Sequence, residues 1–160
     1  MKEMDEIGRK LCVAQAELFV SSLRLAKCSS PIFLRRFMNS AVAKRMDEGG
    51  FLFESSTDVS VMEELESEYG ASQYGKTKYA ENELYWMGYL YRYWCYTYGK
   101  TSKQVYRMMK PTELKTLFYP YHSLDVGAAI ERILEAKNIR EEDFTARGVA
   151  VLRRIVARKS

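Results

Sequence analysis

Residues 81–99, ENELYWMGYLYRYWCYTYG, constrain the fold more than any other stretch of this chain. Eight of the fourteen residues from Tyr85 to Tyr98 are aromatic, and apolar residues fall on every side of the helix that the spacing predicts. A helix that is apolar all round is usually central to its domain. Tyrosine fits such a position when its hydroxyl reaches a hydrogen-bond partner or water. We therefore expect a central aromatic helix wrapped by other helices.

The rest of the chain also shows helical periodicity. Apolar residues recur at three- and four-residue spacing over 3–27, 31–48, 57–69, 125–137 and 141–157, and no segment alternates at period two for long. In the first of these helices the expected inward residues are Ile7, Leu11, Ala14, Leu18 and Leu25. A helix beginning at Ser102 is expected to be interrupted at Pro111 and followed by a short helix over 113–118. The sequence thus predicts an all-α fold, a compact bundle of about six to eight helices in a single domain over 1–160.

Composition sets limits on the class of protein. The 160 residues are 47% hydrophobic and 29% charged, with a net charge of +4, which is typical of a globular domain and compatible with nucleic-acid contact without requiring it. No run of about 18 apolar residues predicts a membrane span, and the acidic N-terminal residues speak against a signal peptide. We therefore expect a cytoplasmic protein that does not bind membranes. The cysteines Cys12, Cys28 and Cys95 lack CxxC spacing and are expected to be reduced, partly buried thiols.

The aromatic helix has two sides with different expected roles. One stripe carries Leu84, Met87, Gly88, Tyr91, Cys95 and Tyr98. The other side carries Trp86, Tyr89, Tyr93 and Tyr96, where a helix of this kind is usually polar. These four residues either lie at the rim of the core or bind a partner protein, because tyrosine and tryptophan dominate binding hot spots. Stacking of single-stranded bases is a third interpretation, but it favours interleaved cations, and only Arg92 is present.

The junction after this helix, WCYTYGKTSKQVYRMM, is typical of a helix-turn-helix. Cys95, Gly99 and Val105 match the spacing of the small, glycine and aliphatic positions, and Met108 matches the next inward position. In such a motif the second helix reads DNA. The residues expected to face DNA are Ser102, Lys103, Gln104 and Arg107. Lys100 departs from the motif because it occupies a position that is usually a buried aliphatic residue, so a corner without nucleic acid is the alternative.

No residue pattern predicts a reaction. His122 is the only histidine, in FYPYHSLD, and no nucleophile motif stands near it, so we expect it to lie at a helix entry and to form local hydrogen bonds. The segments YGKT at 74–77 and YGKTS at 98–102 lack the upstream glycine of a phosphate-binding loop. The acidic face formed by Glu63, Glu64, Glu66 and Glu68 has no histidine at helical spacing, so it is read as a solvated surface. Neither a cofactor nor a metal is expected, and the chain is interpreted as a non-enzyme.

Two blocks of the sequence resemble a small family of uncharacterised proteins of gut Firmicutes. The blocks are IFLRRFMNSAVAKRMDEGGFLF and YWMGYLYRYWCYTYGKTSKQVYRMMKPTELKTLFYPYHSLDVGAAIERILEAK, which together cover about half of the chain. Proteins of that family are similar to antitoxins or accessory proteins of toxin–antitoxin-type modules, including modules with ADP-ribosyltransferase-like toxins. Residues 1–30 precede both blocks, and the sequence leaves open whether this N-terminal helix is peripheral.

The resemblance implies a non-enzymatic, antitoxin-like or accessory protein that binds and neutralises or regulates a partner protein encoded nearby, such as a toxin. A helix-turn-helix transcriptional regulator that binds DNA is the alternative. The two roles are compatible, because antitoxins often repress their own operons. The sequence gives no indication of the oligomeric state.

Overall fold

The computed structural model describes residues 1–53 and 56–138, and the expected helix over 141–157 lies outside them. The all-α fold class is confirmed, since the regular elements of these described residues are helices. In chain order they are α1 (Glu6–Leu25), α2 (Ser30–Met38), α3 (Ala41–Asp47), the 3₁₀ helix η1 (Gly50–Phe53), α4 (Asp58–Tyr69), α5 (Glu81–Tyr98), α6 (Ser102–Met108), α7 (Pro111–Thr116) and α8 (Phe118–Tyr121).

The chain divides into two compact units, residues 1–123 and residues 124–160. The described part of the second unit is a helix that begins at residue 126 and continues to residue 138. The backbone carbonyl and carboxylate of Asp125 accept hydrogen bonds from its first turn, at Ala129 N and Ala128 N. Of the five apolar residues at three- and four-residue spacing in this helix, Ala129, Ile130 and Ile133 are buried and Val126 and Leu134 are half-buried, whereas Glu131 and Glu135 are exposed. The expectation of a single domain over 1–160 stays a prediction.

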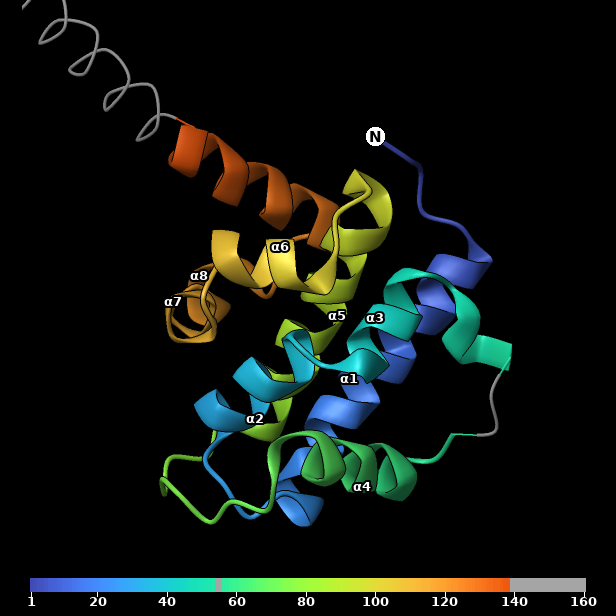
Figure 1. The fold of residues 1–160 in the computed structure, drawn as a ribbon. Coiled ribbons are helices and arrows are strands. Elements are labelled where there is room, and N and C mark those ends of the chain that lie inside the picture. The colour runs from blue at the N-terminus through green and yellow to red at the C-terminus, as the bar shows by residue number, and fades with distance from the viewer. Residues whose placement is uncertain (54–55, 139–160) are drawn as a thin grey trace, which may run out of the picture. The chain divides into compact units, whose positions relative to one another are not determined.

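The first unit is organised around α1 and α5, which lie side by side and antiparallel (Figure 1). Gly88 of α5 faces the backbone of α1 at Gln15 and Ala16, and a Cβ atom there would lie 2.9 Å from the Ala16 Cα. Glycine therefore permits a close approach of the two helices. The helix α4 packs against α1, α2 and α3, and α6 packs against α2, α3 and α5.

The N-terminal helix is central rather than peripheral. Leu11, Cys12, Ala16 and Phe19 are at most 2% exposed, because α1 buries one whole face against α5. The expected register of that face was wrong at its start, since Ile7 is 56% exposed and the neighbouring Gly8 is buried. Gly8 packs beneath the ring of Tyr96, so the buried stripe begins one residue later.

The helix expected over 31–48 is two helices, separated at Asn39 and Ser40. The Ser40 hydroxyl donates to the Phe37 carbonyl at the end of α2 and accepts from Ala43 N at the start of α3. Serine favours such an N-cap because its oxygen satisfies an orphan N–H. The apolar periodicity continues through this break, which explains why the sequence pattern predicted a single helix.

The proline-containing segment also differs from expectation. Pro111 is the first residue of α7 rather than only an interruption, in keeping with the tolerance of proline at N1. Pro120 lies within the short α8. In the described ranges no helix combines the length and apolarity that a membrane crossing requires.

Candidate functional site

The outer side of α5 carries a row of tyrosine rings. Tyr85 and Tyr89 stack with ring centroids 6.4 Å apart, and Tyr93 continues the row at a further 6.4 Å. Residues four apart lie one above the other on a helix, which produces this alignment. Tyr85 is 40% exposed, and Tyr89 and Tyr93 are half-buried. We call Tyr85, Tyr89 and Tyr93 the tyrosine ladder.

Tyr89 of the ladder is a neutral phenol at physiological pH. Burial raises the pKa of Tyr89 above its ordinary value of 10.0, and the nearby Arg9 of α1 opposes that rise. A neutral tyrosine offers an apolar ring together with a hydroxyl that donates and accepts hydrogen bonds. The ladder is therefore suited to contact with another protein surface.

Two of the four residues expected to bind a partner are on the ladder, and two are placed elsewhere. Trp86 is only 7% exposed and packs edge-on against Phe118 of α8, with ring centroids 5.7 Å apart. The Tyr96 hydroxyl donates to the Asp5 carboxylate at 2.7 Å, and the Lys2 ammonium lies 4.1 Å from its ring centroid. Trp86 is thus a core residue, and Tyr96 tethers the N-terminal segment. Tyr85 was not among the residues expected to bind a partner, although its four-residue spacing from Tyr89 places it on the same side of the helix.

The corner after α5 has a left-handed glycine and a buried valine at the positions that the sequence pattern predicted. Gly99 takes the left-handed conformation, with φ of 62° and ψ of 36°, and Val105 is fully buried. Thr101 caps α6 by accepting from Gln104 N, while the Gln104 side-chain oxygen accepts from Thr101 N. Met109, which is 1% exposed, is the next inward residue instead of Met108, and its carbonyl accepts a hydrogen bond from the Tyr91 hydroxyl at 2.6 Å. Lys100 is exposed, so the buried aliphatic contact of the motif is absent at that position.

Three of the four residues expected to face DNA are exposed, and the fourth is not. Lys103, Gln104 and Arg107 are exposed on α6. Ser102 was wrongly placed, because it is 1% exposed and points into the protein. Its hydroxyl donates to the Asp47 carboxylate at 2.7 Å, and its backbone N–H donates to the same carboxylate at 3.0 Å.

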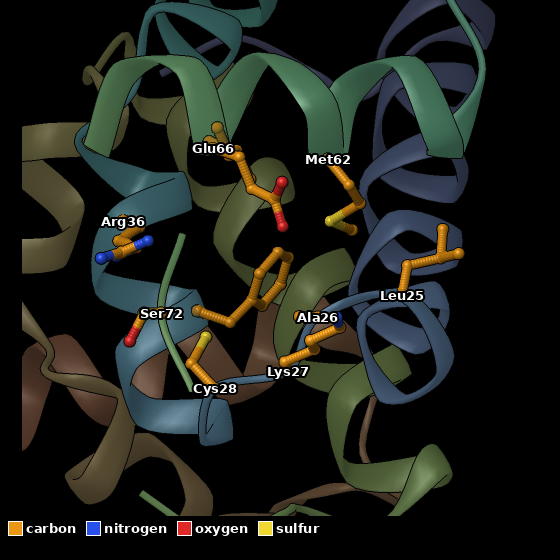
Figure 2. Close-up of a pocket in the computed structure, with 10 residues that line it drawn as sticks. Leu25, Ala26, Lys27, Cys28, Arg36, Met62, Glu66 and Ser72 are labelled. Atoms are coloured by element: carbon orange, nitrogen blue, oxygen red, sulfur yellow. The ribbon is translucent and has the colours of Figure 1, made fainter. Parts of the chain in front are cut away.

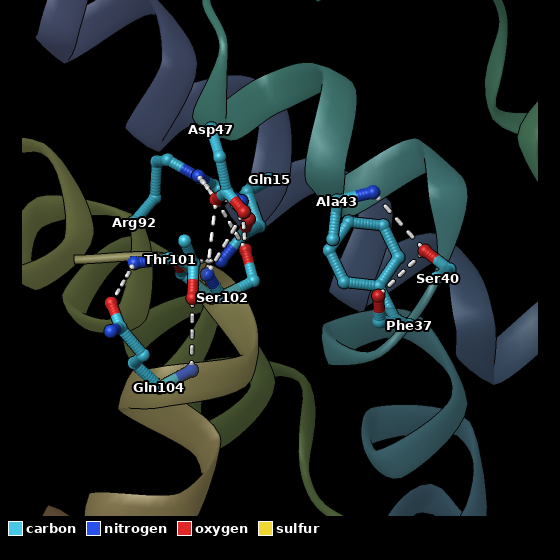
Figure 3. Close-up of polar contacts among 10 residues, drawn as sticks. Gln15, Phe37, Ser40, Ala43, Asp47, Arg92, Thr101, Ser102 and Gln104 are labelled. Carbon is cyan, nitrogen blue, oxygen red and sulfur yellow. Dashed lines mark hydrogen bonds and ion pairs between the residues drawn. The ribbon is translucent and has the colours of Figure 1, made fainter.

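Ser102 belongs to a buried polar network centred on Arg92 (Figure 3). The Arg92 guanidinium donates to Asp47 at 2.6 Å, to the Ser102 hydroxyl at 2.8 Å and to the Gln15 side chain at 2.9 Å. Gln15 in turn donates to the Gly88 carbonyl at 2.9 Å. Arginine is only 1% exposed here, and its fork-shaped donor set satisfies several acceptors at once. The network joins α1, α3, α5 and α6 and fixes where α6 begins.

A surface hollow of about 340 Å³ lies beside this network. It is lined by Met38, Asn39, Ser40, Ala41, Lys44, Asp47, Glu68, Thr101 and Lys103. Lys44 of α3 and Lys103 of α6 are both exposed there. Lys103 was a candidate site residue from the sequence and Lys44 was not, because only the packing of α3 against α6 brings the two lysines to one hollow.

A second cavity lies between α1, α2 and α4, near Cys28 (Figure 2). Its volume is about 30 Å³, and Arg36, Met62 and Glu66 are among the residues that line it. Ligand pockets typically measure about 300 Å³ or more, so this cavity has room for little more than water.

The remaining chemical groups are held in local contacts. The Nδ1 atom of His122 lies 2.8 Å from the Phe118 carbonyl, and its ring stacks on Phe118 at 4.4 Å between centroids. Local hydrogen bonding of His122 is confirmed, at the end of α8 rather than at a helix entry. All three thiols are buried, and burial raises the pKa of Cys12 to about 12 and that of Cys95 to about 11. Over residues 1–53 and 56–138, no three His, Cys, Asp or Glu side chains are grouped to hold a metal ion.

No protein-family model, curated protein or solved structure matches this chain. The resemblance to the antitoxin-associated family therefore stays a prediction.

Proposed function

We propose that this protein is a non-enzymatic, antitoxin-like protein of the cytoplasm that binds and neutralises or regulates a partner protein encoded nearby. The observation that carries the proposal is the tyrosine ladder on the outer side of α5. The inner side of this helix already forms the core, with Leu84, Met87 and Tyr91 fully buried, so the ladder is not needed to complete the core from that side. Exposed or half-buried tyrosines in a row supply large contact area at a small entropic cost.

The test is co-expression of the chain with the product of each adjacent gene, followed by co-purification and titration of the complex. Replacing Tyr85 with Ala removes the most exposed ring of the ladder, and replacing Tyr89 and Tyr93 together removes the other two. Loss of an anchor typically costs about 2 kcal/mol or more of binding free energy, roughly a thirtyfold weaker complex.

Two exposed tyrosines elsewhere provide matched controls. Tyr74 is 79% exposed and Tyr119 is 86% exposed, and neither lies on α5. Substituting either with Ala should leave the affinity unchanged. Equal binding by the wild type and the Tyr85→Ala variant would contradict the proposal, and so would unfolding of the Tyr89→Ala/Tyr93→Ala variant, since the rings would then be core.

A second candidate function is sequence-specific DNA binding through α6, favoured by the left-handed Gly99 corner and the exposed Lys103, Gln104 and Arg107. Arginine suits guanine and the glutamine amide suits adenine in the major groove. The protein's own upstream DNA should bind, and Arg107→Ala should lower the preference for that DNA over an unrelated duplex. If Arg107→Ala kept the wild-type preference for the upstream DNA, the corner at Gly99 would have a structural role and would not read DNA.

A further inference from the structure

Two lysines from distant parts of the sequence face one hollow without a charged partner. In the part of the chain that the structure describes, no ion pair, side-chain hydrogen bond or ring contact involves the Nζ of Lys44 or Lys103. Both residues are exposed and line the hollow between α3 and α6. Lysines elsewhere on the surface do have partners, such as Lys10 with Glu6 and Lys115 with Glu83.

In the described residues, the two carboxylates in the same hollow form no ion pair with these lysines. The Glu68 carboxylate accepts the Ala41 N–H with both oxygens, at 3.1 Å and 3.2 Å. The Asp47 carboxylate accepts from Arg92 and from the N–H and hydroxyl of Ser102. Each carboxylate is therefore turned toward a donor of the protein, and the charge of Asp47 is balanced by Arg92.

The surface on the α6 side of the hollow is also basic, whereas the neighbouring surface of α4 carries the exposed Glu63, Glu64 and Glu68. The segment 100–110 carries Lys100, Lys103, Arg107 and Lys110, all exposed, and no acidic residue. Its charge of +4 equals the net charge of the whole chain, so the rest of the sequence balances to zero. Charge that is segregated in this way attracts a polyanion.

We infer that the hollow between α3 and α6 binds the phosphodiester backbone of duplex DNA through Lys44 and Lys103. This inference deepens the second candidate function and rests on α6 facing DNA. Lysine holds a phosphate as a mobile point charge with three donors, which requires no fixed geometry. The Thr101 hydroxyl also lines the hollow and retains a proton to donate while it accepts from Gln104 N. Backbone contacts of this kind fix the register of a reading helix and carry no sequence information themselves.

The test is a fluorescence anisotropy titration of the full chain against a labelled duplex of arbitrary sequence at several salt concentrations. The variants are Lys44→Gln, Lys103→Gln and the double substitution. The control is Lys10→Gln, which removes the same charge from α1, where the lysine side chain is 65% exposed. Each hollow variant should reduce the slope of log K against log salt by about 0.9, and the double variant by about 1.8. The control should retain the wild-type slope, and all variants should keep the wild-type circular dichroism.

Three results would overturn the inference: no duplex binding at low salt, a wild-type slope in the double variant, or displacement of the duplex by polyglutamate at equal charge. The last result would indicate an acidic protein as the occupant. If sequence-specific DNA binding through α6 were wrong but the inference were right, the results would differ. The duplex would bind with the expected salt slopes, and Arg107→Ala would leave the preference for the upstream DNA unchanged.

Discussion

At the scale of single residues, Arg92 shows what a local sequence pattern cannot reveal. Within the aromatic segment it is the only cation, and for that reason the pattern did not favour stacking of bases. The structure buries it to 1% exposure and surrounds it with Gln15, Asp47 and Ser102. These partners lie on three other helices, so no local spacing could have revealed them. A buried arginine with satisfied donors specifies how helices meet more than it adds to stability.

Replacing Arg92 with Ala should destabilise the fold by about 3–5 kcal/mol, because the buried Asp47 carboxylate would lose its counter-charge. Urea unfolding followed by circular dichroism measures the change. The matched control is Arg24→Ala, since Arg24 pairs with Asp58 on the surface with a side chain that is 67% exposed. Surface pairs contribute little, so the control should scarcely change the urea midpoint. Similar losses in the two variants would show that the Arg92 network is solvated.

The buried thiols predict a pH dependence of stability. Burial raises the pKa of Cys12 to about 12 and that of Cys95 to about 11, against an ordinary value of 9.0. Above pH 9 the unfolded chain therefore releases thiol protons that the folded chain retains, and stability falls as pH rises. We expect the urea midpoint to fall less steeply between about pH 8 and about pH 10.5 in a Cys12→Ala/Cys95→Ala variant than in the wild type. Equal slopes in the two proteins would contradict this prediction.

At the scale of helices, the sequence predicted most elements but not all of their ends. Periodicity located α1 and α4 because each buries one stripe, and it located α5 because apolar residues recur on every side of that helix. It failed between α2 and α3, where the Ser40 side chain ends one helix and begins the next while the apolar spacing continues. Glu68 of α4 also helps to cap α3, because its carboxylate accepts a hydrogen bond from Ala41 N. This contact forms only when α3 and α4 pack together. Capping by a distant side chain leaves no local signal.

The contact of α1 with α5 provides a prediction at this scale. Alanine has a higher helix propensity than glycine by about 1 kcal/mol, so Gly88→Ala would stabilise an isolated helix. In the folded protein the added Cβ would lie 2.9 Å from the Ala16 Cα and 3.0 Å from the Gln15 carbonyl oxygen. Because backbone atoms cannot move away as a flexible side chain can, we expect the free energy of unfolding to fall by about 1–3 kcal/mol. Gly50→Ala is the control, because a Cβ at Gly50 would meet nothing within 4 Å. A stabilised Gly88→Ala variant would show that the helices can separate at little cost.

At the scale of the whole molecule, the sequence predicted the all-α class and the corner at Gly99. It could not predict which side chains from distant segments would meet. Lys44 and Lys103 line the same hollow, and Ser102 donates a hydrogen bond to Asp47. Both arrangements depend on how α3 packs against α6. The partner surface on α5 could be predicted only in part. The four-residue spacing of the tyrosine ladder is local and readable in the sequence, whereas the contact with Phe118 that buries Trp86 depends on the packing of α8.

The two proposed surfaces share no residue, and this leads to a prediction about the whole protein. The ladder lies on α5 beside Arg9 of α1, whereas the hollow lies between α3 and α6. Protein binding and DNA binding should therefore be separable. The Tyr85→Ala variant should lose affinity for the partner and keep wild-type duplex binding, and Lys44→Gln/Lys103→Gln should do the reverse. Because neither surface covers the other, the wild type should carry partner and duplex together, which size-exclusion chromatography with light scattering would detect as one ternary species. Mutual exclusion of the two ligands would instead show that the partner occupies the hollow, and it would reassign the basic surface of α6 to protein recognition.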